Sequence, residues 1–201
     1  MTRVMYDAVT WENIPADAPG ETIIAVYRDG DFAAQAAAVE ARFPPARYPV
    51  IWIDVNGGDP AVSQVLDVET GDAAPAGAPG WVKARLAAVK GSLPTIYCNR
   101  STIAAVASEC AAAGLKLGVH FWLWVSTLDG TQYVADGVVA CQYQGGVTAP
   151  YDKSVVYADW WHCLPAPAPP KPQLVTGAEA EAQVTAIVGA AAKLAVYVRQ
   201  G

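Results

Sequence analysis

Basic residues are scarce in this sequence, and they do not cluster. The 201 residues include 13 Lys and Arg against 19 Asp and Glu, which gives a formal net charge of −6. Nucleic acids and anionic membrane surfaces are recognised through positive charge. The composition therefore argues against both as partners and favours a neutral or cationic one.

Residues that bind metals are also few. There are 2 histidines, and the 4 cysteines lie too far apart for a zinc ribbon or a Cys-x-x-Cys redox pair. We expect no metal and no cofactor, and we interpret the cysteines as buried, reduced thiols. These cysteines are Cys98, Cys110, Cys141 and Cys163.

Long hydrophobic runs are missing. No apolar stretch approaches the roughly 20 residues that span a bilayer, so no membrane segment is expected. The first residues, Met1 to Asp7, pass directly into strand-like sequence without the apolar core and cleavage site of a signal peptide. We therefore expect no export by the general secretory route.

Short β-rich segments are abundant. Hydrophobic residues make up 53% of the chain, and most of these segments are apolar on both faces, as in a buried parallel sheet. Ala-rich helical segments over residues 32–42, 78–89 and 102–113 separate several of them. The predicted strands are Val4–Asp7, Thr22–Tyr27, Val50–Val55, Val65–Val68, Thr95–Cys98, Gly118–Val125, Gly137–Tyr143 and Ser154–Tyr157.

Alternation of strands and helices predicts an α/β fold, here a short and irregular (β/α)8 TIM-like barrel over residues 1–163. The connection between Val55 and Val65 is too brief for a crossover helix, so some helices should be missing. Residues 164–175 are rich in proline and predict an extended linker.

Residues 176–201 have the apolar spacing of one C-terminal helix. That spacing is compatible with docking on its own barrel, on a partner or on a second copy. The stiff linker before it favours an outward contact, either with a virion or within a homo-oligomer.

The strand Val65–Val68 runs into the most informative local pattern, Asp67-Val68-Glu69. Residues two apart on a strand point to the same side. Two carboxylates on one side repel each other and raise one pKa, which suits a general acid beside a charged partner. The simpler interpretation is a strand end whose acids face water or cap the next element.

Other predicted strands also end in polar or aromatic residues. A parallel barrel gathers the carboxyl ends of its strands at one mouth, where several acids would repel one another unless a ligand or a reaction required them. The residues concerned, besides Asp67 and Glu69, are Asp7, Asp54, Asn99, Trp124, Gln142, Tyr143 and Asp152.

In these pieces, taken in this order, the sequence resembles the glycoside hydrolase family 25 lysozymes, in a divergent actinobacterial or actinophage branch. The resemblance covers roughly residues 4–161. It rests on the strand ending in Asp7 and on the segments Leu66-Asp67-Val68-Glu69, Ile96-Tyr97-Cys98-Asn99, Phe121-Trp122-Leu123-Trp124, Cys141-Gln142-Tyr143 and Tyr151-Asp152-Lys153-Ser154.

The resemblance implies that Glu69 is the general acid. Asp67 would orient the substrate's 2-acetamido group, the internal nucleophile in that family, and Asp7 and Asp152 would support both. The remaining mouth residues would bind substrate, with the apolar faces of sugar rings stacking on aromatic side chains. They are Asp54, Tyr97, Asn99, Trp124, Gln142, Tyr143 and Tyr27.

Three hypotheses about function follow. The first is a muramidase-like hydrolase of peptidoglycan or a related cell-wall or surface glycan. The second is a virion structural module, capsid-decorating or tail-associated, with a lysozyme-like barrel that binds glycan or is inactive. The third is a glycan-binding domain that does not cleave. For a phage protein we expect a location in the virion, or in the host cytoplasm before release.

Overall fold

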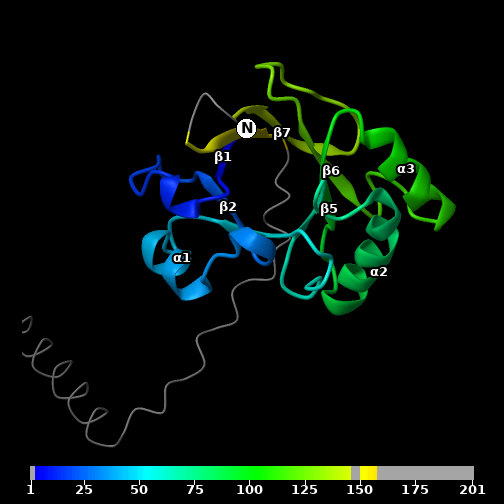
Figure 1. The fold of residues 1–201 in the computed structure, drawn as a ribbon, viewed down its shortest axis with the longest axis horizontal. Helices are drawn as coiled ribbons and strands as arrows, with labels where there is room; N and C mark the ends of the chain where they lie inside the picture. Colours follow the sequence, from blue (N-terminus) through cyan, green and yellow to red (C-terminus); the bar gives the residue numbers. More distant parts are fainter. Residues whose placement is uncertain (1–2, 146–149, 158–201) are drawn as a thin grey trace, which may run out of the picture. The chain divides into compact units, whose positions relative to one another are not determined.

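The computed structural model describes residues 3–145 and 150–157, in which eight strands follow one another around a closed barrel (Figure 1). The predicted linker and C-terminal helix lie outside these residues. All eight predicted strands are present; the sixth starts at Trp122 rather than Gly118, because Gly118 lies in a turn. The strands are β1 Arg3–Asp7, β2 Ile23–Tyr27, β3 Val50–Asp54, β4 Val65–Val68, β5 Thr95–Asn99, β6 Trp122–Ser126, β7 Val138–Gln144 and β8 Asp152–Val156.

Strand β8 runs against its two neighbours, so the prediction of a wholly parallel barrel is wrong there. Strands β1 to β7 are paired in parallel, whereas β8 is antiparallel to both β7 and β1. Residues 145–151 are too few for a parallel crossover, which needs about a dozen. The reversal places Asp152, the first residue of β8, beside Asp7, the last residue of β1.

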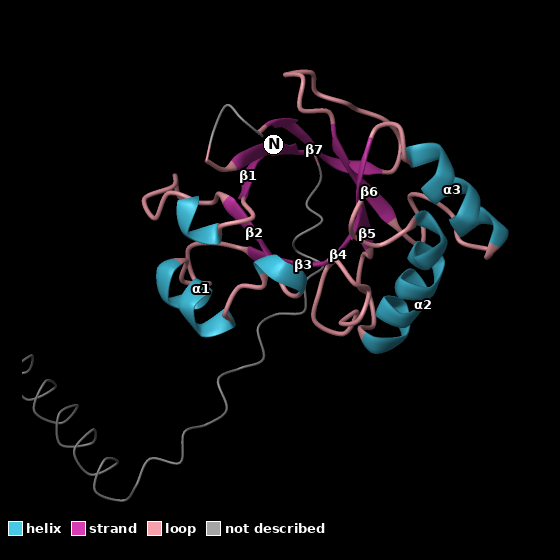
Figure 2. Ribbon diagram, in the orientation of Figure 1, coloured by secondary structure: helices cyan, strands magenta, loops and turns pink. Residues whose placement is uncertain are grey.

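Helices are few, as the short connections predict. The described residues form three α-helices, which lie outside the ring of strands (Figure 2): α1 Ala36–Arg42, α2 Ala78–Ala88 and α3 Ile103–Ala112. The first begins later than predicted because residues 30–32 form a separate 3₁₀ turn, η2 Gly30–Phe32; the other 3₁₀ turns are η1 Trp11–Asn13 and η3 Pro75–Gly77. The connection between β3 and β4 has no helix.

Alternate residues of each strand pack on opposite sides of the sheet, one set inside the barrel and the other set outside it. Leu66 and Val68 pack outward in a cluster with Trp81 of α2, while Val65 packs with Tyr97 inside the barrel. The same alternation turns Asp67 inward. Each buried Val or Leu contributes about 1.5–3 kcal/mol, so the apolar neighbours on β4 fix the direction in which its acid points.

Cysteines 98, 110 and 141 are buried free thiols, as interpreted from the sequence, and Cys163 lies outside the described residues. In the described part of the chain, none of the helices is long and apolar enough to cross a membrane.

Candidate functional site

Four carboxyl groups lie at one end of the barrel, where β1 to β7 finish and β8 begins. Asp7 and Asp152 are paired residues on adjacent strands. Asp67 lies within β4, and Glu69 follows that strand directly. Electrostatic repulsion couples Asp7 to both Asp152 and Glu69, and couples Asp67 to Glu69. We call these four residues the rim acids.

Two of the rim acids are almost completely buried. Asp7 is 3% exposed and Asp67 is 2% exposed. Burial, then repulsion from Asp152 and Glu69, raises the pKa of Asp7 well above its usual value. Burial, then repulsion from Glu69, Asp72 and Asp7, raises the pKa of Asp67 to about 9. At neutral pH, Asp67 therefore holds its proton.

Each of these two buried acids also has an oxygen without a partner. Within the described residues, neither Asp7 Oδ1 nor Asp67 Oδ1 takes part in a hydrogen bond. A buried polar atom left in this state costs about 1–3 kcal/mol. Such an atom calls for an explanation, and a ligand that supplies the missing partner is one.

Glu69 combines partial burial with partial access to solvent. Its side chain is half-buried, and burial followed by repulsion from Asp72 and Asp152 raises its pKa. A carboxyl group that keeps its proton to higher pH and can still meet a ligand has the properties of a general acid.

Asp72 is a further acid close to the rim acids, and the sequence did not single it out as a site residue. The Asp72 N–H donates to the Glu69 carbonyl oxygen at 3.2 Å, so the loop after β4 folds back on itself. This turn brings the exposed Asp72 carboxylate close enough to raise the pKa of Glu69. The turn residues Thr70-Gly71-Asp72 were the available signal.

Tyr27, predicted to bind substrate, faces the rim acids from β2. Its side chain is half-buried, and burial followed by the charges of all four rim acids raises its pKa. Its ring lies 5.9 Å from that of Phe32 in η2. Phe32, which the sequence reasoning missed, is 49% exposed. This pair offers an aromatic surface beside the rim acids.

Trp124 and Tyr97 were predicted to stack on sugar rings, but both lie inside the barrel. Trp124 is 0% exposed and Tyr97 is 6% exposed. Their ring centroids are 4.7 Å apart in an edge-on arrangement, and the Trp124 indole N–H donates to Ser154 Oγ at 2.9 Å. Trp124 therefore supports Tyr97 from below the rim instead of presenting a face to a ligand.

Asp54 was also predicted to bind substrate, but its carboxylate is already fully engaged. It is buried on the outer side of β3, where it accepts hydrogen bonds from the backbone N–H groups of residues 56–59 and from the Trp81 indole. These bonds close the loop after β3. Asp54 is a structural residue outside the group of rim acids.

Asn99 organises a turn as well. Its Oδ1 accepts hydrogen bonds from Ser101 Oγ and from both the N–H and the hydroxyl of Thr102, directly before α3. Tyr143 lies at an irregularity of β7, between Gln142 and Gln144, and its side chain is half-buried. Gln142 is joined to Asp152, as argued below.

Metal binding finds no support in the described ranges, 3–145 and 150–157. They contain no group of three or more His, Cys, Asp or Glu side chains that could hold a metal ion.

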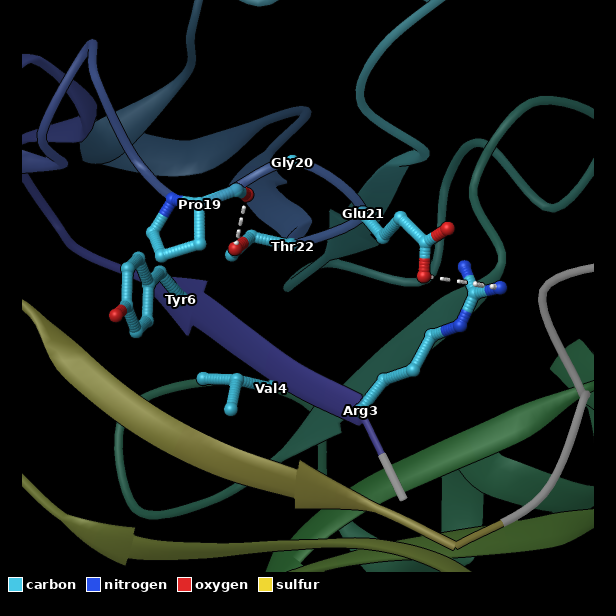
Figure 3. Close-up of a pocket in the computed structure, with 7 residues that line it drawn as sticks. All are labelled: Arg3, Val4, Tyr6, Pro19, Gly20, Glu21 and Thr22. Carbon is cyan, nitrogen blue, oxygen red and sulfur yellow. Dashed lines mark hydrogen bonds and ion pairs between the residues drawn. The ribbon is translucent and has the colours of Figure 1, made fainter. Parts of the chain in front are cut away.

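A hollow of about 210 Å³ lies at the opposite end of β1, where β1 and β2 begin (Figure 3). Its lining includes Arg3 and Glu21, whose charged groups are 3.8 Å apart, and Thr22, which donates to the Pro19 carbonyl oxygen. The ion pair engages Arg3 and Glu21, and the hydroxyl hydrogen bond closes the turn at Thr22. The rim acids therefore remain the stronger candidate for a site.

Comparison with known proteins gives a fold but no function. No known protein family matches the sequence, and no curated protein matches it. The chain is similar to a crystal structure of an uncharacterized B. stearothermophilus protein, with a TM-score of 0.56 and 14% identity over 79% of this chain and 97% of that one. At that identity, the likeness concerns the fold alone.

Proposed function

We propose that the protein is a glycoside hydrolase of the lysozyme type, acting on peptidoglycan or a related glycan, with Glu69 as its general acid. We place its barrel among irregular TIM-like barrels of the family 25 type. The observation that carries the proposal is Glu69 itself. It is half-buried, its pKa is raised, and it stands with three further acids at the end of the barrel.

The reaction begins with a proton transfer. The Glu69 carboxyl group protonates the glycosidic oxygen, and the bond from that oxygen to the sugar carbon breaks. The 2-acetamido oxygen of the same sugar forms a bond to that carbon and closes a ring. Water then opens the ring, and its proton returns to Glu69. The products are a new reducing end and a free hydroxyl.

Asp67 orients the acetamido group in this proposal. Because its pKa is raised to about 9, it holds a proton at neutral pH and can offer both a donor and an acceptor. Asp7, buried with an unpartnered oxygen, accepts a donor from the substrate. Asp152 keeps negative charge close to Glu69, which delays release of the Glu69 proton.

Phe32 and Tyr27 replace Trp124 and Tyr97 as the aromatic surface for a sugar ring. The Phe32 side chain is the more exposed of the pair and lies in the loop after β2. The apolar face of a sugar can pack there while its polar groups reach the rim acids.

The virion-module hypothesis depends on residues 164–201, which lie outside the described residues. It remains a prediction, as do the outward contact of the C-terminal helix and the location in a virion. A non-cleaving glycan-binding domain would use the same rim residues, so it differs from the proposal only in the outcome of catalysis.

A clearing assay tests the proposal. Suspended actinobacterial cell walls should lose turbidity with the wild type, and Glu69→Gln should clear them about 10²–10⁴-fold more slowly, because general-acid assistance has that magnitude. Glu109→Gln makes the same change on the exposed surface of α3 and should clear normally. Equal clearing by wild type and Glu69→Gln would remove Glu69 from the mechanism.

A further inference from the structure

A chain of two hydrogen bonds, one buried and one partly buried, ends on the Asp152 carboxylate. Gln142, in β7, is 2% exposed; its Nε2 donates to Asp152 Oδ2 at 2.6 Å. Its Oε1 accepts from the Tyr97 hydroxyl, which lies on β5. Three strands thus contribute one residue each to a single line of polar groups leading to the site.

The chain has a fixed direction. A carboxamide oxygen can only accept, so Tyr97 must donate to it, and the amide N–H₂ group must then point toward Asp152. With the amide reversed, its oxygen would face the carboxylate oxygen and repel it. The Tyr97 hydroxyl therefore sets the orientation of Gln142, and Gln142 in turn holds the carboxylate.

Packing below the rim keeps Tyr97 in place. The Trp124 ring meets it edge-on, and Trp124 is itself held by Ser154. Burial first, and then the charges of Glu69 and Asp7, raises the pKa of Tyr97, against a hydrogen bond with Ser126 that lowers it. The hydroxyl thus stays protonated and remains a donor over the whole neutral range.

Gly145 leaves room for the carboxylate. A side-chain carbon at this position would overlap the carboxyl group of Asp152. Gly145 is not among the glycines with positive φ, so its backbone alone does not require glycine. The close approach of Asp152 provides a reason for glycine there.

We propose that Gln142 and Tyr97 are positioning residues that hold the Asp152 carboxylate toward the other rim acids, and that Gly145 completes this seat by its lack of a side chain. Gln142 and Tyr97 were predicted to bind substrate, but the side-chain amide of Gln142 is already engaged with the Tyr97 hydroxyl and with Asp152. The proposal rests on the proposed function only in treating Asp152 as a site residue.

The geometry makes a prediction about titration. Among the described residues, Asp7 from β1 and Glu69 from the end of β4 are acids that interact with Asp152, and Tyr27 faces it from β2. The Gln142 N–H opposes the repulsion from these acids, because a donor stabilises a charged carboxylate. Removing that donor should make Asp152 harder to ionise.

Carbon NMR titration of the Asp152 carboxyl group measures this directly, without substrate. Gln142→Leu should raise the titration midpoint by about one pH unit, the size of one lost charge-assisted hydrogen bond. Tyr97→Phe should raise it by less, because Gln142 remains. The matched control is Tyr6→Phe, whose ring packs on Tyr151 outside the barrel and should leave the midpoint unchanged.

Gly145→Ala perturbs the same carboxylate by steric overlap, so it should shift the Asp152 resonance and its titration midpoint. The control is Gly80→Ala, where a side-chain carbon meets nothing within 4 Å and both should stay unchanged. If Gln142→Leu does not fold, Gln142→Glu is nearly isosteric. Its carboxyl group would titrate together with Asp152 and raise the same midpoint.

Activity is a separate readout. If the proposed function holds, Gln142→Leu should lower kcat about tenfold with little change in KM, since it alters positioning and not binding. An inactive wild type would overturn the hydrolase proposal, yet the titration would still decide the positioning role. An unchanged Asp152 midpoint in the folded Gln142→Leu or Gln142→Glu protein would overturn that role, even with full activity.

Discussion

Asp54 and Asp67 lie on adjacent strands near the same end of the barrel, and their surroundings are opposite. Asp54 points outward and is covered by five N–H donors, four from the backbone and one from Trp81. Asp67 points inward beside other acids and has an oxygen without a partner. In this barrel, the side of the strand that a buried carboxylate occupies decides whether N–H donors surround it or other acids do.

Replacing each acid by its amide should shift stability in opposite directions, and the larger effect should be at Asp54. Asp54→Asn replaces one oxygen with an N–H₂ group that faces other donors. We expect a loss of about 3 kcal/mol, because several hydrogen bonds to a charged group are lost or opposed. Urea unfolding measures this; an unchanged midpoint would show that the loop does not depend on the carboxylate.

Asp67→Asn should stabilise the protein by about 2 kcal/mol at pH 7. The pKa of Asp67 is raised in the folded state, from 3.8 to about 9. Its contribution to stability is therefore fully present below about pH 4 and is lost as the pH rises through about 9. The amide cannot ionise and avoids that loss.

The raised pKa of Asp67 also predicts how thermal stability changes between pH 5 and pH 9. The wild type should lose stability over this window, and Asp67→Asn should have a flatter profile. Parallel profiles for the two proteins would mean that Asp67 ionises as easily when folded as when unfolded.

The smallest expected effect concerns the donor from α2. Trp81→Phe keeps an aromatic ring but removes the indole N–H that reaches Asp54 Oδ2 at 2.9 Å. Four backbone donors remain, so the loss should be about 1 kcal/mol, the value of one hydrogen bond. A loss as large as that of Asp54→Asn would show that the indole dominates the loop.

The strands could be predicted because the interior of a barrel requires apolar runs, and the eight runs are separated by glycine, proline and polar residues. The antiparallel β8 was missed although residues 145–151 are too few for a crossover. The length of this connection could be read from the sequence. The argument that a connection is too short for a crossover helix was used between β3 and β4, and it applies equally between β7 and β8.

The position of the rim acids could be anticipated from strand ends, but the division of their roles could not. All residues of β4 are buried, so no alternation of polar and apolar residues reveals which side faces inward. Asp54 is followed by Asn56-Gly57-Gly58, a turn sequence that indicates a loop cap. Asn99 precedes Ser101 and Thr102 at the start of a helix, and the same cue applies there.

The most direct test of the account is whether wild type makes new reducing ends that Glu69→Gln does not. Purified peptidoglycan incubated in heavy-oxygen water, with mass spectrometry of the soluble products, separates hydrolysis from binding. We expect heavy oxygen at the new reducing end with the wild type and at least about 100-fold less with Glu69→Gln. Bound glycan that stays uncleaved by the wild type, or equal labelling by both proteins, would contradict a hydrolase with Glu69 as its acid.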